Sequence, residues 1–207
     1  MDYLLRIRGY LFCIIATVIL SMIPSCGGKS SDIAQKVIKI LPDDGVYSDP
    51  VGAGGEYQDP IHGFFSVTTP SGFRITEKRD KSTFEVVEGP FAGETVRRSW
   101  VQFRSGDLDI GVIARETATS LEEDFRIVVE GLRKAGVKIY RERFVTIDGA
   151  KGGELLGSIK GIMMLTVKYK KDGLDHAITI TAPERKFGDN SEIFMDFLRS
   201  YRSLGTQ

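Results

Sequence analysis

The chain has 207 residues, and its 28 basic and 28 acidic side chains give a net charge of zero. The length fits one domain of about 100–200 residues, and a hydrophobic share of 42% is too high for a disordered chain. Balanced charge argues against nucleic-acid binding, which usually needs a basic excess. Two cysteines are too few for a disulfide framework or a cysteine-based zinc site.

The first residues have the pattern of a secretory signal peptide. Arg6 and Arg8 precede an apolar run at residues 10–23. This run is shorter than the roughly 20 residues that a spanning helix needs, and it fits the 7–15 or so of a signal peptide. The alternative is an uncleaved membrane anchor. We expect a signal peptide at residues 1–25.

The segment Ile23-Pro24-Ser25-Cys26 resembles a bacterial lipobox, in which an aliphatic residue stands three positions before a cysteine and a small residue directly before it. Pro24 departs from the small or β-branched residue that is usual there. The resemblance implies cleavage after Ser25, a diacylglycerol on the Cys26 sulfur and acylation of the new amino terminus. The alternative is an ordinary thiol near a cleavage site. Each buried CH₂ contributes about 0.8 kcal/mol, so several acyl chains would hold the protein stably on a membrane.

The expected location is therefore the exported side of a cell membrane, with the lipid as the anchor. Gly27 follows the cysteine, where an aspartate would suggest retention in the inner membrane of a Gram-negative cell. In such a host we expect the outer membrane, with the protein facing the periplasm.

Residues 26–60 have the composition of a flexible tether, because Gly, Pro, Asp and Ser cluster there as in loops. One island, residues 32–41, places apolar side chains at helical spacing behind Asp32 as a candidate N-cap. It is either a short helix that docks on the domain or a transient one. A flexible segment of about 30 residues has a root-mean-square reach of about 30 Å, which would hold the domain clear of the headgroups.

Residues 61–207 have the pattern of one globular domain. We expect strands at 61–68, 83–87, 96–104, 108–115, 137–147, 153–160, 162–170 and 174–182. Asp148-Gly149 and Asp172-Gly173 predict tight hairpin turns and thus antiparallel pairing. In several strands both the odd- and the even-numbered residues are apolar, which predicts a sheet covered by helices on both faces. The expected class is α+β.

Two helices are expected within this domain. The first begins after Ser120, which has Glu123 at the spacing of a capping box, and ends at Gly136. The acidic residues 122–124 are better explained by the helix dipole than as metal ligands. The second helix is expected at residues 191–203, with Asp189 as its cap and Glu192 at the capping-box spacing.

Four segments carry a resemblance to a known family: 65–73 (FSVTTPSGF), 120–125 (SLEEDF), 147–155 (IDGAKGGEL) and the ending at 169–187 and 194–204. Together they resemble the PsbP-like or Mog-type α/β/α sandwich, which also occurs in DcrB-type envelope lipoproteins. The resemblance implies an antiparallel sheet flanked by helices and a non-enzymatic accessory, assembly or binding role. It supplies no site motif.

Few residues are candidates for chemistry. His176 shares strand parity with apolar neighbours, which favours a packed or edge histidine over a catalytic one. His62 is expected to face solvent near a strand start. Neither has metal-ligand spacing, no serine lies in a G-x-S-x-G elbow, and we expect no metal or cofactor. Lys168, Lys170 and Lys171 are expected to form a solvated strand end.

Trp100 and Arg98 are the candidate binding residues, because they share one parity of an expected strand. An arginine-flanked tryptophan can anchor a binding partner. The alternative is a tryptophan packed beneath a helix.

The expected function is that of a non-enzymatic, lipid-anchored envelope protein that binds or assists a protein partner. The alternative is a carrier or sensor with a small-molecule or lipid pocket between sheet and helix. A hydrolase is the third hypothesis, and it would require His62 or His176 to lie with two carboxylates in a cleft.

Overall fold

The computed structural model describes residues 30–47, 55–79, 82–85, 93, 95–116 and 120–206. Within these ranges the helices are α2 (Ser30–Ile40), α3 (Leu121–Lys134), α4 (Glu184–Asp189) and α5 (Ser191–Ser200). The strands are β1 (Val46–Tyr47), β2 (Gly55–Gln58), β3 (Phe65–Thr69), β4 (Arg74–Glu77), β5 (Thr83–Glu85), β6 (Thr95–Ser105), β7 (Leu108–Glu116), β8 (Lys138–Ile147), β9 (Ala150–Ile159), β10 (Ile162–Lys171), β11 (Leu174–Pro183) and β12 (Arg202–Ser203).

The long strands form one main sheet in the order β1-β8-β9-β10-β11-β7-β6-β4, with β5 paired to β6. A small sheet has the order β12-β3-β2. Apart from the parallel β1–β8 pair, the strand pairs among the described residues are antiparallel. The predicted α+β class, an antiparallel sheet flanked by helices, is confirmed.

Two of the hairpin turns follow directly from the sequence. Asp148 and Gly149 have φ angles of 50° and 71°, and Asp172 and Gly173 have φ angles of 53° and 79°. Two consecutive residues with positive φ are what a type I′ turn requires, and this turn matches the twist of antiparallel strands. These turns fix the registers of β8 with β9 and of β10 with β11.

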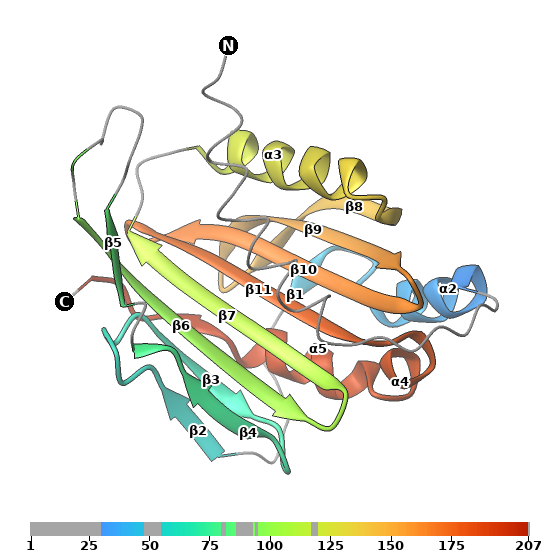
Figure 1. Cartoon of the computed structure of the whole chain (residues 1–207), viewed down its shortest axis with the longest axis horizontal. Helices are drawn as coiled ribbons and strands as arrows, with labels where there is room; N and C mark the ends of the chain where they lie inside the picture. The colour runs from blue at the N-terminus through green and yellow to red at the C-terminus, as the bar shows by residue number, and fades with distance from the viewer. Residues whose placement is uncertain are drawn as a thin grey trace.

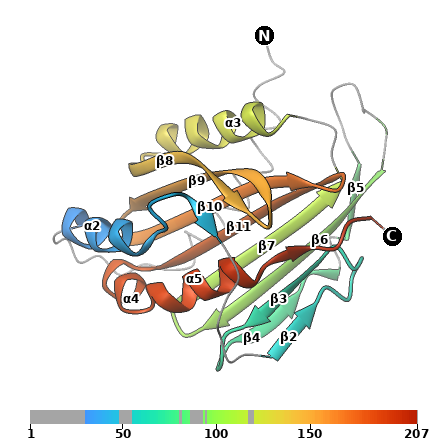
Figure 2. The same ribbon diagram turned by 180° about the vertical axis from the view of Figure 1, so that it is seen from behind.

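The main sheet has two differently covered faces. α2, α4, α5 and the small sheet cover one face, here called the α5 face, whereas α3 lies on the opposite α3 face (Figure 1 and Figure 2). The larger core lies on the α5 face and includes Val101, Phe103, Val112, Leu165, Val167, Phe194 and Phe197. The smaller core joins α3 to the sheet and consists of Phe125, Val128, Val129, Leu132, Val137, Leu155 and Met164.

α3 begins as predicted and lies close to the sheet. The Ser120 side chain accepts a hydrogen bond from the Glu123 backbone N–H at 3.2 Å, as an N-cap does. The Phe125 ring packs on Gly153 of β9, so closely that a Cβ at Gly153 would overlap the ring. The missing side chain at Gly153 therefore sets the distance between α3 and the sheet.

The last helix, α5, begins at Ser191 as predicted, but its predicted cap is wrong. The N-cap of α5 is Asn190, and its side chain makes no capping hydrogen bond. Asp189 is instead the last residue of α4, a short helix that the sequence pattern did not predict. Because α4 ends directly before α5 begins, Asp189 is not available as a cap.

The described part of the predicted tether packs against the domain. In α2, Ala34, Val37 and Leu41, which follows the helix, are at most 1% exposed, and they belong to the larger core. β1 then pairs with β8, and β2 pairs with β3. Residues 30–47 and 55–58 are therefore part of the folded body, and the docked alternative for the helical island is the one the structure contains.

The first strand of the predicted domain begins later than expected, at Phe65, because residues 59–64 form a turn around Asp59. The Asp59 carboxylate accepts hydrogen bonds from the backbone N–H groups of Ile61, His62 and Phe64, at 3.0 to 3.3 Å. The Ser99 hydroxyl of β6 also donates to it, at 2.5 Å. Asp59 thus joins the small sheet to the main sheet.

Candidate functional site

On the α3 face, part of the main sheet has no described helix above it. α3 packs on β9 and β10, and Figure 1 shows no helix over β6 and β7. Helices lie on both faces of the sheet as expected, but among the described residues α3 covers only part of its face. We call the part without a described helix above it the open sheet face and define it by Arg98, Trp100 and Gln102 of β6, Gly111, Ile113 and Arg115 of β7, and Ala177 and Thr179 of β11.

The exposure of alternate residues distinguishes the two faces of these strands. Ser99, Val101 and Phe103 on the α5 face of β6 have no exposed surface, whereas Trp100 and Gln102 between them are partly exposed. β7 alternates in the same way over residues 110–114. The open sheet face is therefore half-buried and has a fully packed core behind it.

Trp100 lies in the middle of the open sheet face. It is opposite Ile113 of β7, which is in turn opposite Ala177 of β11. This row forms an apolar centre. The Arg98 guanidinium lies 5.9 Å from the centroid of the Trp100 ring, within range of a cation–π interaction. The structure thus brings the two predicted binding residues together, and their role in binding stays a prediction.

Charged residues border the open sheet face next to α3. Lys168 of β10 contacts the buried carboxylate of Asp175, whose other neighbour is the Arg115 guanidinium at 2.9 Å. Asp124 of α3 lies 3.8 Å from the Lys168 amine and 3.0 Å from the Lys170 amine. These contacts link the first turn of α3 to β7, β10 and β11.

The prediction that Lys168 is solvated is wrong, since only 2% of the residue is exposed. α3 covers the side of β10 that carries Lys168, and it places a carboxylate near the Lys168 amine. Burial lowers the pKa of the Lys168 ammonium, and the Asp175 charge opposes that effect. Burial would raise the pKa of Asp175, but the Lys168 and Arg115 charges outweigh it and hold that pKa below its ordinary value.

The opposite border of the open sheet face is held by Asp109. Its Oδ2 accepts hydrogen bonds from the Gln102 amide at 2.7 Å and from Arg104 at 2.6 and 3.0 Å. Asp109 is almost fully buried, and its Oδ1 has no hydrogen-bond partner. The Thr181 hydroxyl, on the residue opposite Asp109 in the register, is also buried without a partner.

His176 is packed, which is one of the two placements that the strand parity favours. Its ring nitrogens lie 3.0 Å from the Tyr201 hydroxyl and 3.0 Å from the Ser203 hydroxyl, and the ring stacks on Tyr169. Burial lowers the pKa of His176 to about 4, so the ring is neutral at pH 7.

His62 is half-buried rather than solvent-facing. Its Nε2 lies 2.9 Å from the backbone oxygen of Ser82, and its ring stacks on Phe64. Across the part of the chain that the structure describes, no three His, Cys, Asp or Glu side chains gather in a way that could hold a metal ion.

Cys26 and Ser25, the predicted lipidation and cleavage positions, lie outside the described residues. Lipid attachment therefore stays a prediction. Among the helices of the described ranges, none is long and apolar enough to cross a membrane.

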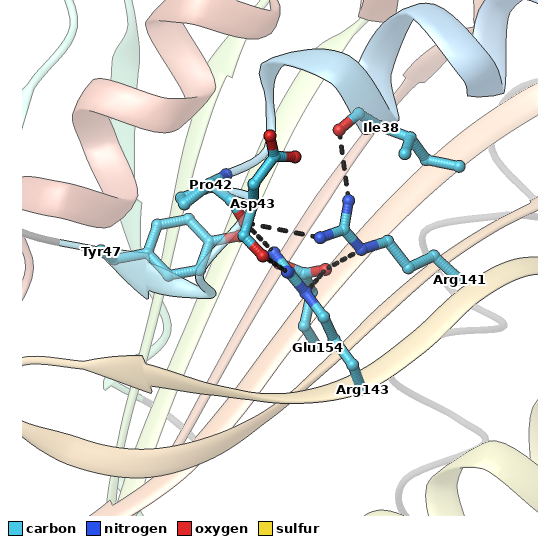
Figure 3. Close-up of polar contacts among 7 residues, drawn as sticks. All are labelled: Ile38, Pro42, Asp43, Tyr47, Arg141, Arg143 and Glu154. Atoms are coloured by element: carbon cyan, nitrogen blue, oxygen red, sulfur yellow. Dashed lines mark hydrogen bonds and ion pairs between the residues drawn. The ribbon is translucent and has the colours of Figure 1, made fainter.

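Sequence reasoning missed a buried charged group beneath the end of α2, shown in Figure 3. We call Tyr47, Arg141, Arg143 and Glu154 the Glu154 cluster. Glu154 has no exposed surface, and its carboxylate lies 2.9 Å from Arg143 Nε and 3.2 Å from Arg141 Nε. The Tyr47 hydroxyl donates to the same carboxylate at 2.5 Å. Burial raises the pKa of Tyr47, so this hydroxyl stays protonated.

The two arginines of the Glu154 cluster also hold the chain that follows α2. Arg141 donates to the backbone oxygens of Ile38 at 3.2 Å and Pro42 at 3.4 Å. Arg143 donates to those of Pro42 and Asp43. The sequence feature that could have revealed this cluster is the Asp148-Gly149 turn, because a two-residue hairpin loop there places Arg143 opposite Glu154.

A solvent-open hollow of about 300 Å³ lies between α3 and β8. Its apolar lining is limited to Phe125, Val129 and Phe144, and its charged lining consists of Glu122, Arg126, Glu130, Arg133, Glu142 and Arg143. Ion pairs of 2.8 Å and 2.6 Å join Arg126 to Glu130 and Arg133 to Glu142. Such a lining differs from the apolar enclosure that a carrier of small apolar ligands needs.

Comparison with known proteins supports the fold. No protein-family model matches the chain, and no curated protein matches it in sequence. Among solved structures, cyanobacterial PsbP (CyanoP) from Synechocystis is similar, with a TM-score of 0.50 and 15% identity over 74% of this chain and 95% of CyanoP. The Ran-binding protein Mog1p of Saccharomyces cerevisiae has a TM-score of 0.43 and 14% identity over 75% of this chain and 97% of its own. The similarity to CyanoP establishes a PsbP-like fold.

Proposed function

We propose that this protein is a non-enzymatic binding protein that recognises a protein partner through its open sheet face. The observation that carries the proposal is the position of Trp100, partly exposed at the centre of a sheet area without a described helix above it. Tryptophan and arginine supply much of the binding energy at protein interfaces, and both are present here within 5.9 Å of each other.

The charge of the open sheet face favours a partner with acidic side chains. Arg98 and Arg115 are directly opposite each other on β6 and β7. Like charges in opposing positions of a sheet repel each other. Asp175 pairs with Arg115, and the Arg98 guanidinium lies beside the Trp100 ring, so an acidic group of a partner that contacts Trp100 would be attracted to these two arginines. The expected epitope therefore combines an apolar group over Trp100 with an acidic group near Arg98.

We propose further that the protein is exported and held on a membrane by lipid on Cys26. The support comes from the lipobox-like sequence and the signal-peptide pattern before it. Several acyl chains would make the attachment stable. In a Gram-negative host the expected site is the outer membrane, facing the periplasm.

No specific observation favours either alternative function, the carrier or sensor or the hydrolase. The hollow beside α3 is lined mainly by charged side chains. The contacts of His62 and His176 are with a backbone oxygen and with hydroxyl groups, whereas the hydrolase hypothesis needs a histidine beside two carboxylates.

The experiment is co-purification from cross-linked membranes with a tagged chain. We expect one reproducible partner, whose recovery falls at least tenfold with Trp100→Ala, because truncation of a central interface aromatic costs about 2 kcal/mol or more. Ile193→Ala is the matched control: Ile193 is an apolar residue of α5, 38% exposed, on the opposite face. Equal recovery with both variants, or no reproducible partner, would contradict the proposal.

The lipid anchor is tested separately by cell fractionation. A Cys26→Ser variant should lose acyl labelling and leave the membrane fraction. If this variant remains in the membrane fraction, the apolar run at residues 10–23 is the anchor and the lipid proposal fails.

A further inference from the structure

The first element of the folded body lies only a few residues after Cys26. α2 begins at Ser30, and its apolar side packs into the larger core through Ala34 and Val37. Its early part also packs beside α4, where Ile33 of α2 lies against Gly188 of α4. The start of α2 is therefore held against the body by side-chain packing.

The end of α2 is held independently of its start. The Glu154 cluster places two guanidinium groups on the backbone oxygens of Ile38, Pro42 and Asp43 (Figure 3). Directly after this segment, β1 pairs with β8. An arm that is packed at its beginning and hydrogen-bonded at its end does not act as a flexible tether.

The chain between Cys26 and α2 is short. Four residue steps separate Cys26 from Ser30, and an extended chain spans at most about 3.6 Å per residue. Ser30 therefore lies within about 14 Å of the Cys26 α-carbon. This upper limit is about half the root-mean-square reach of about 30 Å that a flexible segment covering residues 26–60 would have.

The elements at this end of the body form a definite surface. α2 and α4 lie side by side at one end of the molecule, and β5 and the start of α3 lie at the other end (Figure 1 and Figure 2). The exposed charged side chains of α2 and α4 are basic at Lys36, Lys39, Arg185 and Lys186, and acidic at Asp32 and Asp189. Lys186 is paired with Asp107 at 2.6 Å, and the exposed Asp43 and Asp44 follow α2 directly, so this end carries no net basic excess. Lys36 and Lys39 are single cationic side chains that anionic headgroups attract.

We infer that the α2–α4 end of the body lies directly against the headgroups of the bilayer, with Lys36 and Lys39 facing lipid phosphates. This inference rests on the proposed lipid attachment at Cys26. The open sheet face then runs along the side of the anchored body, because it faces the viewer in Figure 1 while α2 and α4 mark one end. A partner in or near the same membrane can reach Trp100 without displacing lipid.

Energy transfer to the bilayer tests this orientation. Lipid-modified protein with a single added cysteine, Arg185→Cys at the α2–α4 end or Thr83→Cys at the far end, is labelled with a donor dye. The protein is bound to phosphatidylethanolamine–phosphatidylglycerol vesicles that carry acceptor dyes on their headgroups. We expect several-fold more efficient transfer from position 185 than from position 83.

A matched variant provides the control. An insertion of 20 Gly/Ser residues between Gly28 and Lys29 lengthens the connection without altering the body, and it should bring the two transfer efficiencies close together. Equal efficiencies without the insertion, or greater transfer from position 83, would overturn the orientation.

Flotation and intact mass separate this result from a failure of the anchor. Protein that does not float with vesicles and carries an unmodified Cys26 would refute both the lipid proposal and the orientation. Protein that floats with an acylated Cys26 but shows equal transfer from both positions would refute the orientation alone.

Discussion

The Glu154→Gln variant offers a quantitative test of how the arm formed by α2 and β1 is held. Glu154 has no exposed surface, and its carboxylate neutralises two guanidinium groups that are themselves mostly buried. Removing one partner of a buried ion pair costs about 3–5 kcal/mol. An amide oxygen still accepts one hydrogen bond, and both arginines keep their backbone carbonyl partners. We therefore expect the lower end of that range, about 3 kcal/mol of unfolding free energy.

The matched control is Glu142→Gln. Glu142 lies on β8, one strand away, and pairs with Arg133 at 2.6 Å in an exposed position. Exposed ion pairs contribute about 0–1 kcal/mol. Urea unfolding followed by circular dichroism gives the free energy of each variant by linear extrapolation.

The location of the effect is measured by hydrogen exchange. Amides of α2 should exchange faster in Glu154→Gln than in the parent chain, whereas those of α3, which packs on the other face, should change less. If Glu154→Gln and Glu142→Gln have the same unfolding free energy, or if α2 exchange is unchanged, the Glu154 cluster does not hold the arm and this reasoning is refuted.

Three further variants test other parts of the structure. Gly153→Ala should cost about 1–3 kcal/mol in a urea titration, because its Cβ overlaps the Phe125 ring and α3 must shift; an unchanged midpoint would contradict this packing. Thr181→Val should raise the unfolding free energy by about 1 kcal/mol, since it removes a buried hydroxyl without a partner; a loss of stability would show that the hydroxyl is satisfied. His176 has a folded-state pKa of about 4 against an ordinary 6.5. Its contribution to the free energy of unfolding is therefore complete above pH 6.5 and is lost as the pH falls toward 4. The parent chain should therefore lose about 3 kcal/mol more than His176→Gln between pH 7 and pH 4, and parallel pH profiles would contradict the neutral, buried ring.

Local signals in the sequence predicted most of the sheet. The Asp148-Gly149 and Asp172-Gly173 pairs fixed two hairpins, because positive φ at both positions has few other solutions. The cap at Ser120 located the start of α3 within one residue. The parity of His176 favoured a packed or edge ring over a catalytic one, and the structure contains the packed ring.

Properties set by tertiary contacts were missed. Lys168 has the local pattern of a solvated strand end, and only the placement of α3 above β10 makes it a buried cation. The loop-like composition of residues 26–60 concealed an arm that packs on the core through three apolar side chains. The short strands β2, β4 and β12 carry little periodicity of their own, and they form because neighbouring strands supply their hydrogen bonds.

The central claim is that the open sheet face around Trp100 binds a protein partner. Its most direct test is site-specific photo-crosslinking in intact cells, with benzoylphenylalanine at position 102, next to Trp100 on the same face of β6, or at position 56, an exposed residue of β2 in the small sheet. We expect a discrete crosslinked species from position 102 that is absent from position 56 and is lost when Trp100→Ala is added. Equal crosslinking from the two positions, or a species at position 102 that is unaffected by Trp100→Ala, would contradict this claim.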